Sequence, residues 1–169
     1  DSRNNPFQQG QGLAAARGAS SRGVAVTIVD DNPMPGGQYF RQAASDSLRR
    51  IAGAIFDESV RGASLLGTVD HARVDYRPDS TALGFFESEL SVVSGGRATM
   101  LSPRCTVIAA GCTERPAPFP GWTLPGVIGA GSAQNLMKSQ RIVPGKRILV
   151  GGNGPLNLLA ASNLVRLGA

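Results

Sequence analysis

A short apolar run, followed at once by two acids and a Pro/Gly loop, is the most informative pattern in the chain. Residues 24–29 are apolar or β-branched, polarity rises at Asp30 and Asp31, and residues 32–37 contain two prolines and two glycines. A continuous apolar run bounded by turn residues is typical of a strand buried on both faces. An acid at the end of such a strand is where a dinucleotide fold places the partner of a ribose hydroxyl.

The rest of the chain alternates between helix-like and strand-like patterns. Small or apolar residues at intervals of three and four predict helices over 12–21, 43–60, 129–140 and 156–167. Short apolar runs beside glycine turns predict strands over 24–30, between 85 and 101 as a meander, and over 107–110 and 147–150. We expect the strand over 107–110 to be buried.

This order of elements predicts an α/β protein with two parts. Residues 1–127 are expected to form a partial FAD/NAD(P)-binding Rossmann-type domain that contains the antiparallel meander. Residues 128–169 are expected to begin a second dinucleotide-binding domain. Between them, residues 113–126 contain four prolines and can be neither a helix interior nor a central strand, so we expect an ordered connection.

Composition narrows the function classes. With 41% hydrophobic and 17% charged residues in 169, the chain has a globular composition. The net charge of +5 comes from scattered arginines without a basic run, so we expect no nucleic-acid partner. No apolar run approaches 18 residues and no basic, apolar leader opens the sequence, so we expect a cytoplasmic protein without a membrane span. Cys105 and Cys112 lack zinc spacing, and we expect both to be small buried residues.

A glycine-rich turn near the end of the chain is a first candidate for nucleotide binding. Residues 148–157 read ILVGGNGPLN, in which Gly152 and Gly154 follow a predicted strand and precede a predicted helix. That context suits a dinucleotide fingerprint, because pyrophosphate could reach the N–H groups at the helix start. Asn157 replaces the third glycine, and a plain strand–turn–helix explains the pattern equally well.

The corresponding turn near the beginning is altered. Counting back about 20 residues from Asp30 leads to residues 7–12, which read FQQGQG. Gly12 takes the third glycine position, but Phe7 and Gln9 stand where the first two glycines belong. A side chain there crowds the approach of pyrophosphate.

The sequence provides no catalytic constellation. We find no nucleophile triad, no metal cluster and no carboxylate pair, and we assign no catalytic and no metal-binding residue. His71, the single histidine, has no partner in the sequence and is expected at the surface. Glu114 and Arg115 are expected to form a structural bridge in the proline-rich connection.

Two longer segments carry a family resemblance. Residues 26–42 (VTIVDDNPMPGGQYFRQ) and 106–127 (TVIAAGCTERPAPFPGWTLPGV) resemble FAD-dependent amine oxidoreductases with two dinucleotide-binding domains. The chain most resembles the alpha-type subunit of opine oxidases, hydroxyproline dehydrogenases and hydrogen cyanide synthase, which is related to sarcosine oxidase alpha. The resemblance covers residues 12–169. These proteins are considerably longer, and the chain resembles their N-terminal third.

The resemblance implies FAD as cofactor and assigns roles by position. Asp30 would accept hydrogen bonds from the adenosine ribose, and Gly36, Gly37 and Gln38 would line the adenine-nucleotide side. Ala109, Ala110 and Gly111 would pass their backbone close to the cofactor. Gly152 and Gly154 would form the second nucleotide turn, which could take NAD(P). It also implies a hetero-oligomer, in which a beta-type subunit oxidises the C–N bond of an amino-acid substrate.

The function expected on this basis is FAD-dependent dehydrogenation of a secondary amino acid or opine. Two other interpretations stay open: a truncated, non-catalytic remnant of the family, and an NAD(P)H-dependent flavin reductase. The altered turn at Phe7 and Gln9 leaves open whether the chain is an enzyme by itself. The next strand of the second domain would distinguish NAD from NADP, and the sequence does not contain it.

Overall fold

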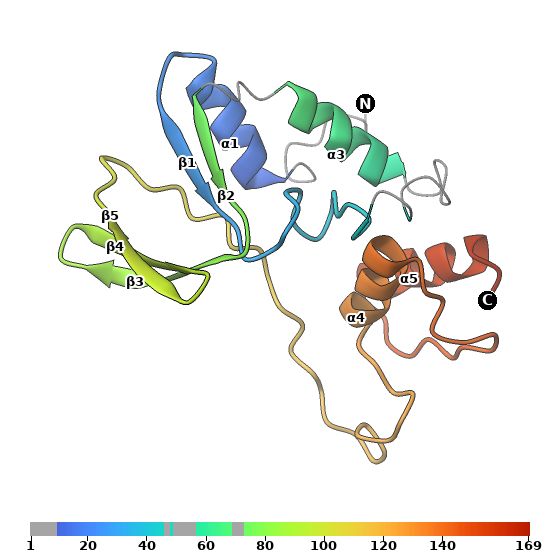
Figure 1. Ribbon diagram of the computed structural model, residues 1–169. Helices are drawn as coiled ribbons and strands as arrows, with labels where there is room; N and C mark the ends of the chain where they lie inside the picture. The colour runs from blue at the N-terminus through green and yellow to red at the C-terminus, as the bar shows by residue number, and fades with distance from the viewer. Residues whose placement is uncertain (1–9, 46–47, 49–56, 69–72) are drawn as a thin grey trace. The chain divides into compact units, whose positions relative to one another are not determined.

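The computed structural model describes residues 10–45, 48, 57–68 and 73–169 (Figure 1). The expectations for Phe7, Gln9 and His71, and most of the helix predicted over 43–60, fall outside these residues. The chain divides into two compact units. The first contains the described residues up to Gln42 together with Glu58–Ala110, and the second contains those of Ala43–Asp57 together with Gly111–Ala169. Each unit is described by itself.

The first unit begins with a helix that leads into a strand. Helix α1 (Gln11–Ser20) buries Leu13, Ala16 and Ser20, which lie at intervals of three and four along one face. Gly23 then takes a φ of +81°, a left-handed conformation that favours glycine, before strand β1 (Val26–Val29). The helix and the strand predicted for this region are confirmed.

A second strand pairs with β1 in parallel. Strand β2 (Val74–Arg77) aligns with β1 from Val26↔Val74 to Val29↔Arg77. In the part of the chain that the structure describes, β2 is the strand that pairs with β1. The apolar residues of β1 are therefore half-buried, and the predicted burial on both faces is wrong.

The predicted meander is confirmed. Strands β3 (Ser80–Phe86), β4 (Glu89–Ser94) and β5 (Arg97–Leu101) form an antiparallel sheet in that order. Two glycines with positive φ, Gly95 and Gly96, make the turn between β4 and β5. Val92, in the central strand β4, is the buried apolar residue of this sheet.

The remaining helix of the first unit lies later in the chain than its pattern predicted. Helix α3 is described as Asp57–Gly67, whereas residues 43–45, expected to be helical, are not. The apolar spacing indicated a helix but did not fix its boundaries. The second half of α3 contains Gly62 and Ser64, which weaken the apolar pattern there.

Helices dominate the second unit. Helix α4 (Ala130–Asn135) continues into a π-helical turn, η3 (Leu136–Gln140), and packs against α5 (Pro155–Arg166). Ala133, Met137 and Leu164 form the buried core, with Val143 and Leu167 packed against it. Both helices predicted here are confirmed. Among the described residues, no helix is long and apolar enough to cross a membrane.

Two predicted strands are absent from the described structure. Residues 106–110 and 147–150 are non-regular, and their apolar side chains are exposed, with Ile108 80% and Leu149 96% accessible. A strand of this kind forms only beside a hydrogen-bonded neighbour, and the described residues do not supply one to either segment. Cys105 and Cys112, which flank the first segment, are likewise exposed, so their predicted burial is wrong.

Candidate nucleotide-binding site

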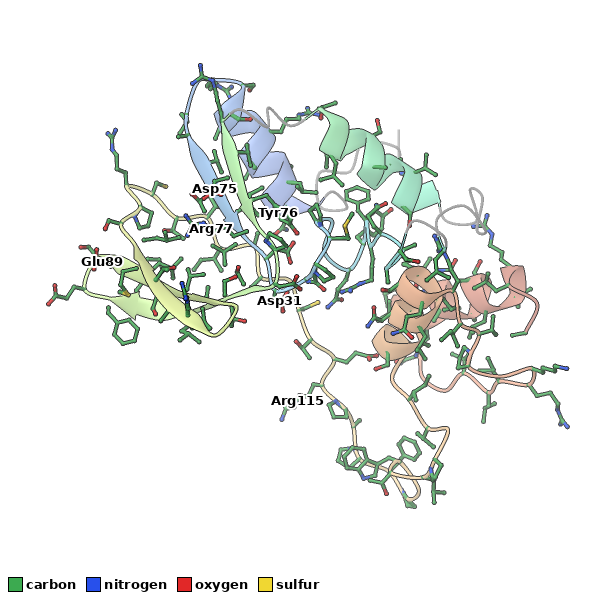
Figure 2. The ribbon with its side chains drawn as sticks, in the orientation of Figure 1. Asp31, Asp75, Tyr76, Arg77, Glu89 and Arg115 are labelled. Carbon is green, nitrogen blue, oxygen red and sulfur yellow. The ribbon has the colours of Figure 1, made fainter. Side chains whose placement is uncertain are left out.

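Asp30 lies at the carboxyl end of the parallel pair, where its backbone is held on two sides. Its N–H donates to the Arg77 carbonyl oxygen at 3.1 Å, which extends the ladder between β1 and β2 by one bond. Its own carbonyl oxygen accepts the Ser80 N–H at 2.9 Å, at the start of β3. Figure 2 shows Asp31, the next residue, at the same end of the sheet as Tyr76 and Arg77 of β2. This is the edge at which parallel α/β sheets bind nucleotides.

A tight turn fixes the Asp30 carboxylate. Its Oδ1 accepts two hydrogen bonds from Asn32, one from the backbone N–H and one from the side-chain amide Nδ2, both at 3.0 Å. The same Nδ2 also donates to Asp31 Oδ1 at 2.6 Å. The Asn32 side-chain oxygen accepts from Arg41 Nη1 at 3.1 Å. Asn32 therefore links two neighbouring carboxylates and an arginine.

Tyr76 contacts this turn from β2. Its half-buried hydroxyl donates to the Asn32 carbonyl oxygen at 3.4 Å. Burial raises the pKa of Tyr76 well above its ordinary value, and the negative charge of Asp30, a hydrogen bond to Asp30 and the charge of Asp79 raise it further. The phenol therefore stays neutral and remains a hydrogen-bond donor at physiological pH.

The loop after the turn folds back on itself at Gly36. The Phe40 N–H donates to the Gly36 carbonyl oxygen at 3.1 Å, and Gly36 is buried with a φ of +126°. Gly37 has a φ of +57° and is exposed, as is Gln38. Of these three predicted site residues, Gly36 has a structural need for glycine, and the other two lie on the surface where a ligand could reach them.

Three predicted site segments meet at the start of α1. A Cβ placed on Gly10 would lie 3.3 Å from the Phe40 ring and 3.7 Å from the Gly36 carbonyl oxygen. A Cβ placed on Gly12 would lie 3.6 Å from the Ala109 Cβ. Gly10, at the N-cap of α1, provides no side chain to bond the first N–H groups of the helix. Free helical N–H groups between small residues suit a phosphate.

The other predicted site residues are not drawn into this cluster by any contact of the first unit. Ala110 and Gly111 are exposed. Gly152 and Gly154 belong to the second unit, where Gly154 is the N-cap of α5. There the Asn157 side-chain amide donates to the Gly151 carbonyl oxygen at 3.1 Å and lies against Gly152. Asn157 thus closes the glycine turn from the helix that follows it.

Sequence reasoning missed three members of the first cluster. Asn32 could have been found, because Asp-x-Asn after a strand favours a turn closed by side-chain bonds to the backbone. Arg41 and Tyr76 approach it from positions 9 and 44 residues away. The pairing register of β1 and β2 brings Tyr76 there, and no local pattern signals that register.

Together, the parallel pair, the acid at its carboxyl end, the helix beside it and the meander define a partial dinucleotide-binding domain of the α/β class. A solved structure supports this fold: the chain superposes on L-proline dehydrogenase from P. horikoshii with a TM-score of 0.77. The match covers 95% of this chain and 32% of that one, at 20% sequence identity. The predicted fold class is confirmed.

Comparison with curated proteins gives the more particular likeness. The chain is 34% identical over 166 residues to an opine oxidase subunit of Rhizobium meliloti and 38% identical over 166 residues to the opine oxidase subunit of the same name from Agrobacterium tumefaciens. It is 34% identical over 158 residues to the hydrogen cyanide synthase subunit HcnB of Pseudomonas protegens. The predicted resemblance to these alpha-type subunits is therefore confirmed.

These matches cover 90–93% of this chain but 31–33% of the relatives. The chain therefore spans about a third of the length of the curated relatives that it matches. A scan against models of known protein families gives no match.

Proposed function

We propose that this chain binds the adenosine diphosphate portion of FAD and contributes it to an amino-acid or opine oxidoreductase. The position of Asp30 carries the proposal: an oriented carboxylate at the carboxyl end of β1, close to the loop that packs on the start of α1. A carboxylate there suits the ribose hydroxyls, and the uncapped helix start suits the diphosphate.

The roles of the individual residues follow from this assignment. Asp30 accepts hydrogen bonds from the adenosine ribose, and Gly37 and Gln38 border the adenine side. Gly12 and Ala109 leave space for the diphosphate, since both side chains are minimal where their segments meet. Ala110 and Gly111 continue along the cofactor. When bound, FAD supplies the two-electron acceptor for oxidation of a C–N bond, and the protein supplies its position.

The proposed substrate class and assembly rest on the names of the relatives. Several are opine oxidase subunits, and the structural neighbour is an L-proline dehydrogenase. These names support a secondary amino acid or opine as substrate. The word subunit in the names supports a hetero-oligomer with a beta-type oxidase chain, which would hold the substrate.

A second nucleotide turn forms part of the proposal. We assign residues 1–127 to the FAD-type domain and 128–169 to the start of a second dinucleotide-binding domain. Gly152 and Gly154 border the start of α5, whose Pro155 occupies the first turn without needing an N–H partner. This turn would accept the diphosphate of NAD(P).

A direct test is to incubate the chain with excess FAD, desalt it and record the visible spectrum. We expect a retained flavin band between about 350 and 500 nm, as the cofactor's own ring system gives. ADP in excess should displace the band, whereas riboflavin should not, because riboflavin lacks the adenosine diphosphate that the site holds. A colourless protein after desalting would refute the proposal.

A further inference from the structure

We infer that Asn32 is a positioning residue for the adenosine ribose, and that Tyr76 and Arg41 hold it in place. This inference rests on the proposed function, since it concerns how Asp30 meets the ribose. Asn32 would touch the acceptor rather than the ligand. Its effect on binding would pass through the direction in which the Asp30 carboxylate points.

The geometry of the turn gives Asn32 this control. Its backbone N–H and its Nδ2 both donate to the same oxygen, Asp30 Oδ1, at 3.0 Å. Two donors from different directions fix that oxygen, and because the carboxylate is planar, they also fix the direction of Oδ2. A carboxylate fixed in this way loses little freedom when it accepts a ribose hydroxyl.

Asn32 also separates two charges. Its Nδ2 lies 3.0 Å from Asp30 Oδ1 and 2.6 Å from Asp31 Oδ1. Adjacent carboxylates repel each other and would turn apart without a shared donor. The amide therefore keeps Asp30 at the sheet edge while Asp31 stays exposed.

Three contacts hold Asn32 itself. Its carbonyl oxygen accepts from the Tyr76 hydroxyl at 3.4 Å and from the Asp79 N–H at 3.3 Å. Its side-chain oxygen accepts from Arg41 Nη1 at 3.1 Å. These donors come from β2, from the start of the meander and from the end of the Pro/Gly loop, so separate parts of the first unit converge on one residue. Such a supporting set is what a preorganised ligand contact requires.

The neighbouring Asp75 provides a matched control. It precedes Tyr76 on β2 and so projects to the opposite side of the strand, where it pairs with Arg77 at 2.8 Å. Figure 2 labels all three residues. Asp75→Asn removes a carboxylate from the same strand without touching the turn.

The test compares ADP with 2′,3′-dideoxy-ADP, which lacks the ribose hydroxyls, in equilibrium binding to the full chain. We expect the wild-type chain to prefer ADP by about tenfold or more, the scale of a hydrogen bond to a charged group. Asn32→Ala should remove most of that preference and Tyr76→Phe part of it, each with little change in dideoxy-ADP affinity. Asp75→Asn should keep the wild-type ratio.

The outcomes separate the two proposals. A wild-type preference that survives in both Asn32→Ala and Tyr76→Phe would overturn the positioning role and leave the assignment of Asp30 standing. A wild-type chain that binds ADP and dideoxy-ADP equally would overturn the assignment of Asp30 and the positioning role with it. If Asn32→Ala fails to fold by circular dichroism, the ratio for Tyr76→Phe decides, because that variant keeps the ring and removes one hydroxyl.

Discussion

Gly36 and Phe40 approach each other so closely that position 36 has no space for a side chain. A Cβ placed on Gly36 would lie 2.6 Å from the Phe40 carbonyl oxygen, while the Phe40 N–H donates to the Gly36 carbonyl oxygen at 3.1 Å. The loop that leaves Asp30 is thus closed by backbone contacts. It then returns through Arg41 to the turn at Asn32.

The first prediction follows from this contact. Gly36→Ala should lower the free energy of unfolding by roughly 2–4 kcal/mol, because it combines a positive-φ penalty with overpacking. Gly37→Ala is the control: at a φ of +57° with nothing within 4 Å of the added Cβ, it should cost about 1–2 kcal/mol. Urea unfolding followed by circular dichroism measures both. Equal losses would mean that the Gly36 contact is not a constraint.

Helix α3 supplies the second prediction, because it holds the segment that carries Arg41. The Gln42 side-chain amide donates to the Ser59 carbonyl oxygen at 3.0 Å, and the Ser59 hydroxyl donates to the Arg41 carbonyl oxygen at 2.8 Å. A Cβ on Gly62 would lie 2.6 Å from the Phe40 Cβ. Gly62→Ala should therefore destabilise by about 1–3 kcal/mol despite the better helix propensity of alanine.

The matched variant for α3 is Gly67→Ala, where the added Cβ meets nothing within 4 Å. It should change stability by less than about 1 kcal/mol in the same urea series. If Gly62→Ala proved as stable as the wild type, the close packing of α3 on Phe40 would be wrong.

Local patterns predicted much of this architecture, and long-range pairing explains the misses. The runs at Val26–Val29 and in the meander were readable because each carries its own turn residues. The segments containing Ile108 and Leu149 look equally strand-like, but a strand also needs a neighbour, and sequence pattern does not report one. For the same reason Asp30 could be predicted, whereas the approach of Tyr76 could not.

Two leucines of the second unit give the third prediction. Leu164 is 4% exposed in the core, whereas Leu149 is 96% exposed. Leu164→Ala should cost about 2–5 kcal/mol through lost burial and a cavity, and Leu149→Ala should stay within about 0.5 kcal/mol. Thermal and urea unfolding of both variants test this. A large loss in Leu149→Ala would show that residues 147–150 are packed rather than exposed.

The fourth prediction concerns alkaline pH. Burial, followed by the nearby charge of Asp30, raises the folded-state pKa of Tyr76 above its ordinary value of about 10. Above that pH the unfolded chain releases the phenolic proton more readily than the folded chain, so the unfolded state binds fewer protons and stability falls as pH rises. The contribution is fully present below about pH 10 and is lost as the pH rises towards the folded-state pKa.

Tyr76→Phe removes this group and should flatten the stability curve between about pH 9 and 11 relative to the wild type. Urea midpoints across that range measure the difference. Parallel curves for the two proteins would contradict the placement of the Tyr76 hydroxyl beside Asp30.

The most direct test of the central claim is a calorimetric titration of the wild-type chain and Asp30→Ala with FAD. We predict one binding site in the wild type and at least about tenfold weaker binding in Asp30→Ala, because the ribose loses its charged acceptor. A melting curve for each protein checks that both are folded. Absence of FAD binding by the folded wild-type chain, or equal affinity in the two proteins, would contradict the assignment of this edge of the sheet as the adenosine site.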